Sequence, residues 1–204
     1  YLMEYPHECS EQTFNRYYAN ALARHIAGSD RKMRRIFDQW KAGGDALDSP
    51  LMKNADLKGI LLDETPWLRE AKNEAEARRR VGLLFDENHM NHELEKALRK
   101  LSKMQRGDGL WPWFPGGHGS EYISLYVTTG FGRLRSLGVE TDITPAMKAL
   151  PALDAAVTRR YERLRTSGNL DRNNLSSWIA HYLYTRTFFL KDKKLSQRDK
   201  VAFD

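Results

Sequence analysis

Apolar residues recur every three or four positions along almost the whole chain, which is the spacing of one face of an α-helix. The first such stretch contains Phe14, Tyr17 and Ala21. A glycine, or a Ser-Pro or Thr-Pro pair, separates several stretches from their neighbours, as expected at helix ends and helix starts. The periodic stretches cover residues 9–27, 30–40, 50–61, 66–85, 86–104, 122–137, 144–164 and 171–189. No stretch shows the alternation typical of a β-strand, so the pattern predicts an all-α protein.

One segment interrupts this pattern. Residues 107–119 read GDGLWPWFPGGHG and hold five glycines, two prolines and three aromatic residues. So many aromatic residues favour a structured loop over a flexible linker. The helices are therefore expected to run in pairs joined by short turns, and the whole chain, residues 1–204, is expected to form a single domain.

Composition and charge exclude several classes of protein. The chain has 204 residues, of which 41% are hydrophobic and 29% charged, as in soluble globular proteins and unlike disordered ones. The net charge of +6 permits an acidic partner without requiring one. The basic clusters lie on helical faces and lack a nucleic-acid recognition motif, so no nucleic-acid binding is expected. No apolar run approaches the roughly 20 residues that span a bilayer.

The chain has a single cysteine, Cys9, which excludes an internal disulfide and a multi-cysteine metal site. Gln12 follows it three positions later, and residues at this spacing share a face in the first turn of a helix. A thiolate held there can attack the Gln side-chain amide and expel ammonia, because proximity makes a poor electrophile reachable. The resulting thioester would capture an amine or hydroxyl once. The spacing alone is also compatible with Cys9 being an unreactive free cysteine that is buried in the core.

The string Cys9-Ser10-Glu11-Gln12, with Tyr5-Pro6 before it, resembles the thioester motif of the α2-macroglobulin and complement family. The opening YLMEYPHECSEQTFNRYYANALA is similar to the bacterial branch of that family. In the family the Cys and Gln form the bond and the Glu supports the motif, which implies these roles for Cys9, Gln12 and Glu11. One departure is Glu8, where family members commonly have a glycine that permits positive φ and close backbone approach.

A second motif has the form QxxxGxW and consists of Gln105, Gly109 and Trp111. It resembles loops of α/α-toroid proteins such as terpene cyclases, and similar Asp-Gly-aromatic loops occur in macroglobulin thioester domains. Its expected role is structural: a helix end, a glycine turn and an aromatic residue packed over the next helix. The resemblance implies an α/α toroid of helical hairpins. Because the family's domain is longer than this chain, the toroid is expected to be incomplete here.

Two further groups of residues bear on a thioester. Water hydrolyses a thioester, so aromatic side chains are expected to cover it. Each residue proposed for this role could equally be an ordinary core residue. The candidates are Tyr5, Phe14, Tyr17 and Trp113. In complement proteins a histidine receives the acyl group and directs it toward hydroxyls; no histidine here matches that motif, which favours amines. His118, in the glycine-rich loop, is the candidate for acyl transfer. His89 and His92 lack an evident third ligand, so no metal and no cofactor are expected.

Taken together, the motifs resemble the thioester-bearing domain of a bacterial α2-macroglobulin-like protease inhibitor rather than an enzyme. In such proteins, cleavage of a bait region exposes the thioester, which couples to lysine side chains of the target protease. The resemblance also implies other domains of the same parent chain as partners and a periplasmic, envelope-attached or extracellular location. Because the chain begins with Tyr1 instead of Met, it is expected to be part of a longer multidomain chain.

Two alternatives stay open at this point. An α/α-toroid enzyme of terpene cyclase or prenyltransferase type would require an Asp-rich diphosphate-binding or protonating motif, and neither DDxxD nor DxDD occurs. The prenyltransferase zinc would require a cysteine ligand, and the one cysteine lies in the CxEQ string. An inert structural helical domain would instead leave Cys9 free to react with thiol reagents.

Overall fold

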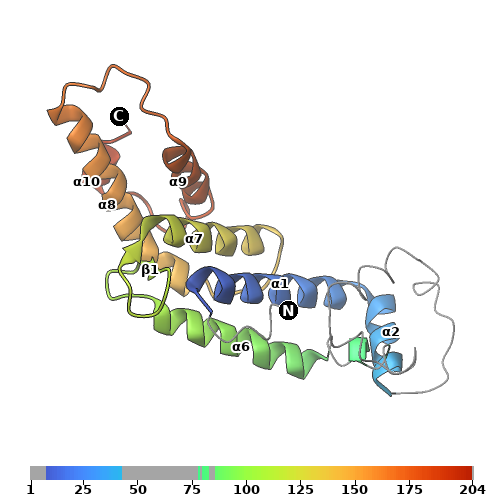
Figure 1. The fold of residues 1–204 in the computed structure, drawn as a ribbon. Coiled ribbons are helices and arrows are strands. Elements are labelled where there is room, and N and C mark those ends of the chain that lie inside the picture. Colours follow the sequence, from blue (N-terminus) through green and yellow to red (C-terminus); the bar gives the residue numbers. More distant parts are fainter. Residues whose placement is uncertain (1–7, 43–77, 79, 83–85, 204) are drawn as a thin grey trace. The chain divides into compact units, whose positions relative to one another are not determined.

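The computed structural model describes residues 8–42, 78, 80–82 and 86–203 (Figure 1). Its elements are, in chain order, α1 (Ser10–Ser29), α2 (Arg31–Ala42), α6 (Glu87–Met104), β1 (Trp111–Pro112), β2 (Gly119–Ser120), α7 (Glu121–Ser136), α8 (Thr144–Thr166), α9 (Ser177–Thr187) and α10 (Gln197–Lys200). The prediction of an all-α protein is confirmed, whereas the toroidal arrangement stays a prediction. The helix expected at 50–61 and most of the one expected at 66–85 lie outside the described residues.

The chain divides into two compact units. Among the described residues, unit 1 contains residues from 19 to 96, and unit 2 contains residues 8–18 and 97–203. The helices α1 and α6 each contribute residues to both units. That residues 1–204 form a single domain stays a prediction.

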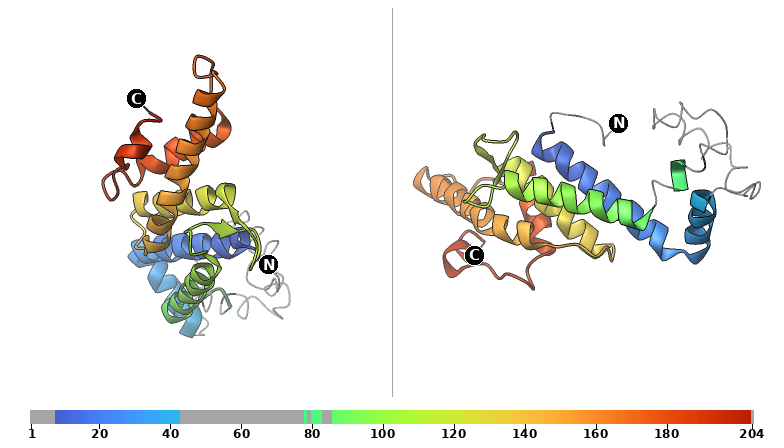
Figure 2. Two further views of the ribbon diagram at one scale, coloured as in Figure 1. Left: turned by 90° about the vertical axis from the view of Figure 1, so that its left-hand side faces the viewer. Right: turned by 90° about the horizontal axis from the view of Figure 1, so that it is seen from below.

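Unit 2 is built around α7, which packs against α8 and α9, while α10 packs against α8 (Figures 1 and 2). Two glycines of α7 allow aromatic side chains to approach this helix closely. A Cβ at Gly130 would lie 2.2 Å from the Phe14 ring, and a Cβ at Gly132 would lie 2.5 Å from the Phe188 ring. The Phe14 ring also contacts Phe131 at a centroid distance of 5.3 Å. These glycines therefore let the Phe14 ring of α1 and the Phe188 ring at the end of α9 pack directly on α7.

Unit 1 contains a smaller apolar cluster. Phe37 and Trp40 of α2 are buried and meet edge to face at a centroid distance of 5.7 Å. Gly82 lies so close to the backbone of α2 that an added Cβ would stand 2.7 Å from the Lys41 nitrogen. Arg24 donates a hydrogen bond of 2.7 Å to Asn91, which links α1 to α6 within this unit.

Most predicted helix boundaries agree with the structure to within about two residues, and α9 is the exception. The pattern predicted a helix from residue 171, but α9 begins at Ser177. The Ser176 side chain accepts a hydrogen bond from the Ile179 N–H and so caps the helix. Before it, the Asn174 amide donates to the Asn169 and Arg172 carbonyl oxygens, which holds this segment in a turn. Local side-chain hydrogen bonds thus replace the first expected helical turn.

The glycine-rich segment is a structured loop, as predicted. β1 and β2 pair antiparallel within it, with Trp111 opposite Ser120. These strands are two residues long, too short to produce an alternating pattern in the sequence. Among the described residues, no helix is long and apolar enough to cross a membrane.

Candidate functional site

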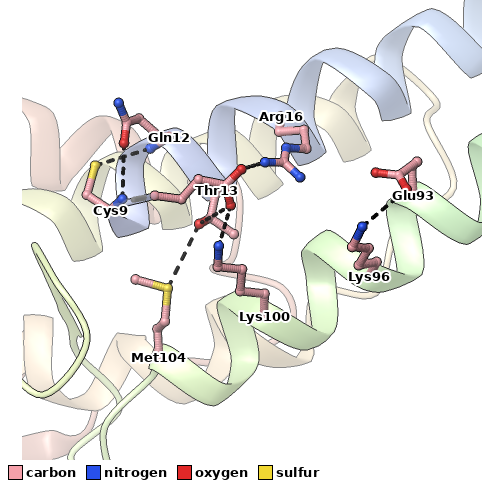
Figure 3. A network of polar contacts seen from close by, with 9 residues as sticks. Cys9, Gln12, Thr13, Arg16, Glu93, Lys96, Lys100 and Met104 are labelled. Carbon is pink, nitrogen blue, oxygen red and sulfur yellow. Dashed lines mark hydrogen bonds and ion pairs between the residues drawn. The ribbon is translucent and has the colours of Figure 1, made fainter. Parts of the chain in front are cut away.

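Cys9 and Gln12 meet at the start of α1. The Cys9 carbonyl accepts the first helical hydrogen bond, from the Thr13 N–H at 3.0 Å. The Cys9 Sγ accepts a hydrogen bond from the Gln12 N–H at 3.4 Å, and the Gln12 Oε1 accepts one from the Cys9 N–H at 3.1 Å (Figure 3). This reciprocal pair has the pattern of a capping box, with cysteine in the place usually taken by Ser or Thr. The two side chains predicted to react therefore lie together.

The same two hydrogen bonds polarise both groups. A backbone N–H pointing at the Gln12 carboxamide oxygen withdraws charge from its carbon and matches the donors that stabilise an oxyanion. The Cys9 sulfur lies at the positive end of the α1 dipole, where developing negative charge is stabilised. Cys9 is also buried, which keeps bulk water away from the sulfur. The site therefore places a hydrogen-bonded carboxamide beside a buried sulfur.

The glycine-rich loop holds the start of α1. The Ser10 N–H donates a hydrogen bond of 2.9 Å to the Trp113 carbonyl oxygen, which satisfies one of the unpaired donors of the helix. Trp113 is itself 43% exposed, and its ring stacks on Tyr122 at a centroid distance of 6.0 Å. Trp113 thus contacts the start of α1 through its backbone, and shielding by its ring stays a prediction.

Two of the other residues predicted to shield the thioester, Phe14 and Tyr17, pack in the core of unit 2. Phe14 and Tyr17 are buried on α1, where both rings pack on Phe131. The Tyr17 hydroxyl forms a hydrogen bond of 2.6 Å with Thr141. Tyr5 lies outside the described residues. Glu11 occupies the first turn of α1, where a carboxylate interacts favourably with the helix dipole.

A buried ionic cluster directly precedes Cys9, and the sequence did not predict it. The Glu8 carboxylate pairs with Arg16 of α1 and with Lys100 of α6, and the Lys100 Nζ lies 2.6 Å from it. The Thr13 hydroxyl lies 3.3 Å from the same carboxylate and 3.9 Å from the Met104 sulfur. Burial, together with the nearby positive charge of Arg16, lowers the pKa of Lys100. The one available signal was the acidic residue at a position where related motifs have glycine.

The QxxxGxW loop adopts the structural arrangement expected of it. The Gln105 side-chain amide donates to the Gly109 and Pro145 carbonyl oxygens, both at 2.8 Å, and so ties the loop to the start of α8. Gly109 has a φ of +86°, and an added Cβ would lie 2.1 Å from the Lys148 carbonyl oxygen. Trp111 is fully buried, and its ring N–H donates to the Leu101 carbonyl oxygen at 3.0 Å.

Among the described residues, no hydrogen bond joins a histidine to Cys9 or Gln12. His118 is exposed between β1 and β2, and within the described residues it forms no hydrogen bond; acyl transfer by His118 stays a prediction. His181 of α9 lies 2.8 Å from the Thr129 hydroxyl. Burial and the charge of Arg133 lower the pKa of His181. In the part of the chain that the structure describes, no cluster of three or more His, Cys, Asp or Glu residues could hold a metal ion.

Comparison with known proteins adds no further assignment. No protein-family model, no curated protein and no solved structure matches this chain.

Proposed function

We propose that this chain is the thioester-bearing part of a protease inhibitor similar to bacterial α2-macroglobulins, and that it couples target amines through a bond between Cys9 and Gln12. The observation that carries the proposal is the reciprocal pair of hydrogen bonds between these two residues. An arrangement of this kind brings nucleophile and electrophile together before any reaction, which is the main requirement for attack on an unactivated amide.

Bond formation would proceed by addition and elimination. The Cys9 thiol loses its proton and its sulfur attacks the Gln12 Cδ, so that negative charge develops on Oε1. The Cys9 N–H already donates to this oxygen and stabilises the charge. The intermediate then expels the side-chain nitrogen, which takes the thiol proton and leaves as ammonia. The product is a thioester between Sγ and Cδ.

Capture would use the same site once. An amine on the target, such as a lysine side chain, attacks the Cδ of the thioester. The carbon–sulfur bond breaks, the amine proton passes to the sulfur, and the target remains linked to Gln12 by an amide. Cys9 is then a free thiol and the reaction does not repeat, so the protein acts as a single-use trap rather than as an enzyme. The preference for amines is supported by the absence of a histidine matching the acyl-transfer motif of complement proteins.

The proposal extends to the surroundings implied by the resemblance. The chain would work within a larger multidomain protein located in the periplasm, attached to the envelope or outside the cell. Cleavage of another part of that protein by a protease would expose the thioester. The helices of unit 2 would contribute to an α/α toroid of the kind that carries this motif in the α2-macroglobulin family.

The test is a measurement of intact mass and free thiol on the native chain, with and without methylamine. We expect a mass lower than the sequence mass by one ammonia and no titratable thiol. Methylamine should then release one thiol and add to Gln12, as located by peptide mapping. Cys9→Ala is the matched control and should show neither the mass loss nor the incorporation.

A second candidate function is supported by the same hydrogen bonds, since a capping box also stabilises a helix without any chemistry. In that case Cys9 and Gln12 are structural residues of an inert helical domain. The native chain would then have the full sequence mass and a thiol that titrates at Cys9, and methylamine would not be incorporated at Gln12. This outcome would refute the thioester proposal for the chain.

A further inference from the structure

The Glu8 carboxylate is almost completely removed from solvent, because its side chain is only 2% exposed. Ionised carboxylates are buried in proteins only where cations and hydrogen-bond donors surround them. Arg16 pairs with one carboxylate oxygen, and the Lys100 Nζ lies 2.6 Å from the other. The Thr13 hydroxyl lies 3.3 Å from that second oxygen. Glu8 is thus anchored by three partners.

These partners come from two helices. Thr13 and Arg16 are three residues apart and share a face of α1. Lys100 belongs to α6, and Figure 3 shows its side chain extending toward Thr13. All of these residues belong to unit 2. The segment entering α1 is therefore fixed to the sides of two helices at the residue directly before Cys9.

One peptide group connects Glu8 to the pair of Cys9 and Gln12. The amide that joins Glu8 to Cys9 carries the N–H that donates to the Gln12 Oε1 at 3.1 Å. Helix geometry fixes the Cys9 side of this peptide, since the Cys9 carbonyl accepts from the Thr13 N–H. The other side depends on the backbone of Glu8, whose side chain is held by Arg16 and Lys100.

We propose that Glu8 is a positioning residue for the thioester: its ion pairs with Arg16 and Lys100 keep the Cys9 N–H directed at the Gln12 side-chain oxygen. This inference rests on the proposed function and identifies a residue that affects the rates of thioester formation and of attack by an amine. The N–H stabilises charge on the oxygen while the sulfur–carbon bond forms and ammonia leaves. It does so again when an amine attacks, as the carbon–nitrogen bond forms, the carbon–sulfur bond breaks and the amine proton moves to the sulfur. Glu8 acts in both steps only through this peptide.

The first test compares the reactivity of the full chain with that of Glu8→Gln. The second-order rate constant for methylamine is measured by thiol release and expressed per molecule that carries a thioester. Because a misdirected oxyanion donor weakens transition-state stabilisation, we expect attack on Glu8→Gln to be about ten-fold slower. A merely structural role would loosen the site and speed attack by amine and water. An unchanged or faster rate therefore overturns the proposal.

Three further variants separate position from charge. Glu121→Gln makes the same chemical change at a carboxylate that pairs with Arg159 and Arg160, and it should keep the wild-type rate constant. Arg16→Lys retains the cation beside Glu8 and should preserve more of the rate than Arg16→Met. Equal rates for these two Arg16 variants would contradict the role of the ion pair.

A second measurement does not depend on the thioester. Amide hydrogen exchange of the Cys9 N–H is followed by NMR in methylamine-treated wild-type protein and in Glu8→Gln treated in the same way. Loss of the anchored orientation should increase exchange at Cys9 about ten-fold or more, because opening of that hydrogen bond requires only local motion. Equal exchange overturns the inference about Glu8. If the wild-type chain carries no thioester, the proposed function fails, and this measurement still decides whether Glu8 orients the peptide.

Discussion

The Cys9 sulfur accepts the hydrogen bond that caps α1, and the same atom is the proposed nucleophile. Serine is the ordinary residue at such a position, and its hydroxyl accepts a hydrogen bond from the Gln12 N–H equally well. We therefore expect Cys9→Ser to keep the helix cap while losing all methylamine incorporation. Cys9→Ala should lose both, and its free energy of unfolding should lie about 1 kcal/mol below that of Cys9→Ser. Urea denaturation and mass spectrometry measure the two effects separately.

Gln12→Glu provides the reciprocal change. A glutamate oxygen still accepts from the Cys9 N–H, so the capping box is retained. Its carboxylate has no ammonia to lose and is a far weaker electrophile. The expected result is a helix as stable as in Cys9→Ser, a sequence mass without loss, and a free Cys9 thiol. A mass deficit in this variant would contradict the assignment of Gln12 as the acyl donor.

A pH dependence is expected at His181. Burial and Arg133 lower its pKa below the usual 6.5, so between these two values the unfolded chain binds more protons than the folded one. By linkage, the contribution of His181 to stability is complete above about pH 6.5 and is lost as the pH falls through that value toward the folded pKa. Urea unfolding measured across this range should show a steeper loss for wild type than for His181→Gln. Equal slopes for the two proteins would show that His181 does not contribute to the pH dependence of stability.

The sequence could predict that Cys9 and Gln12 lie together, but not how Glu8 beside them is anchored. Cys9 and Gln12 are close in sequence, so helical geometry alone brings them together. The anchoring of Glu8 depends on Lys100, which is 92 residues away. No periodicity links positions so distant in sequence, and only the packing of α6 beside the first turns of α1 brings them together.

For the helices too, the sequence pattern shows local spacing but not the contacts that distant residues make. Gly130 could be recognised in the sequence only as an unfavourable residue within the apolar pattern of α7. The structure gives its reason, because the Phe14 ring occupies the space where a side chain would be. The start of α9 was predicted about six residues early, because a periodic pattern does not reveal that Asn174 and Ser176 bind the local backbone.

Gly130→Ala tests this close contact between α1 and α7. Its Cβ would lie 2.2 Å from the Phe14 ring, which is itself buried and contacts Phe131 and Tyr126. We expect the free energy of unfolding to fall by about 1–3 kcal/mol, as for other overpacked cores. Gly28→Ala is the matched control, since its Cβ meets only a flexible Arg34 side chain at 3.4 Å. This control should be neutral or slightly stabilising because alanine favours the helix, and a comparable loss there would contradict the packing argument.

For the whole molecule, the division into two units determines which parts of the chain the site depends on. Cys9, Gln12, the residues that anchor Glu8 and the loop around Trp113 all belong to unit 2. That unit combines a short N-terminal segment with the second half of the chain, so the site is assembled from segments about 90 residues apart. The motif near the N-terminus consequently depends on helices that follow much later in the sequence.

Two tryptophan variants test this dependence. Trp111→Ala removes a fully buried ring from unit 2, together with its hydrogen bond to Leu101, and Trp40→Ala removes a buried ring from unit 1. Each is expected to cost about 3–5 kcal/mol of stability in its own unit. Trp111 lies two residues before the carbonyl that holds the Ser10 N–H. We therefore expect faster thioester hydrolysis in Trp111→Ala, measured by thiol release in buffer without amine, and a rate close to wild type in Trp40→Ala. Equal acceleration in both variants would mean that the integrity of the site depends on the stability of the whole chain rather than on unit 2.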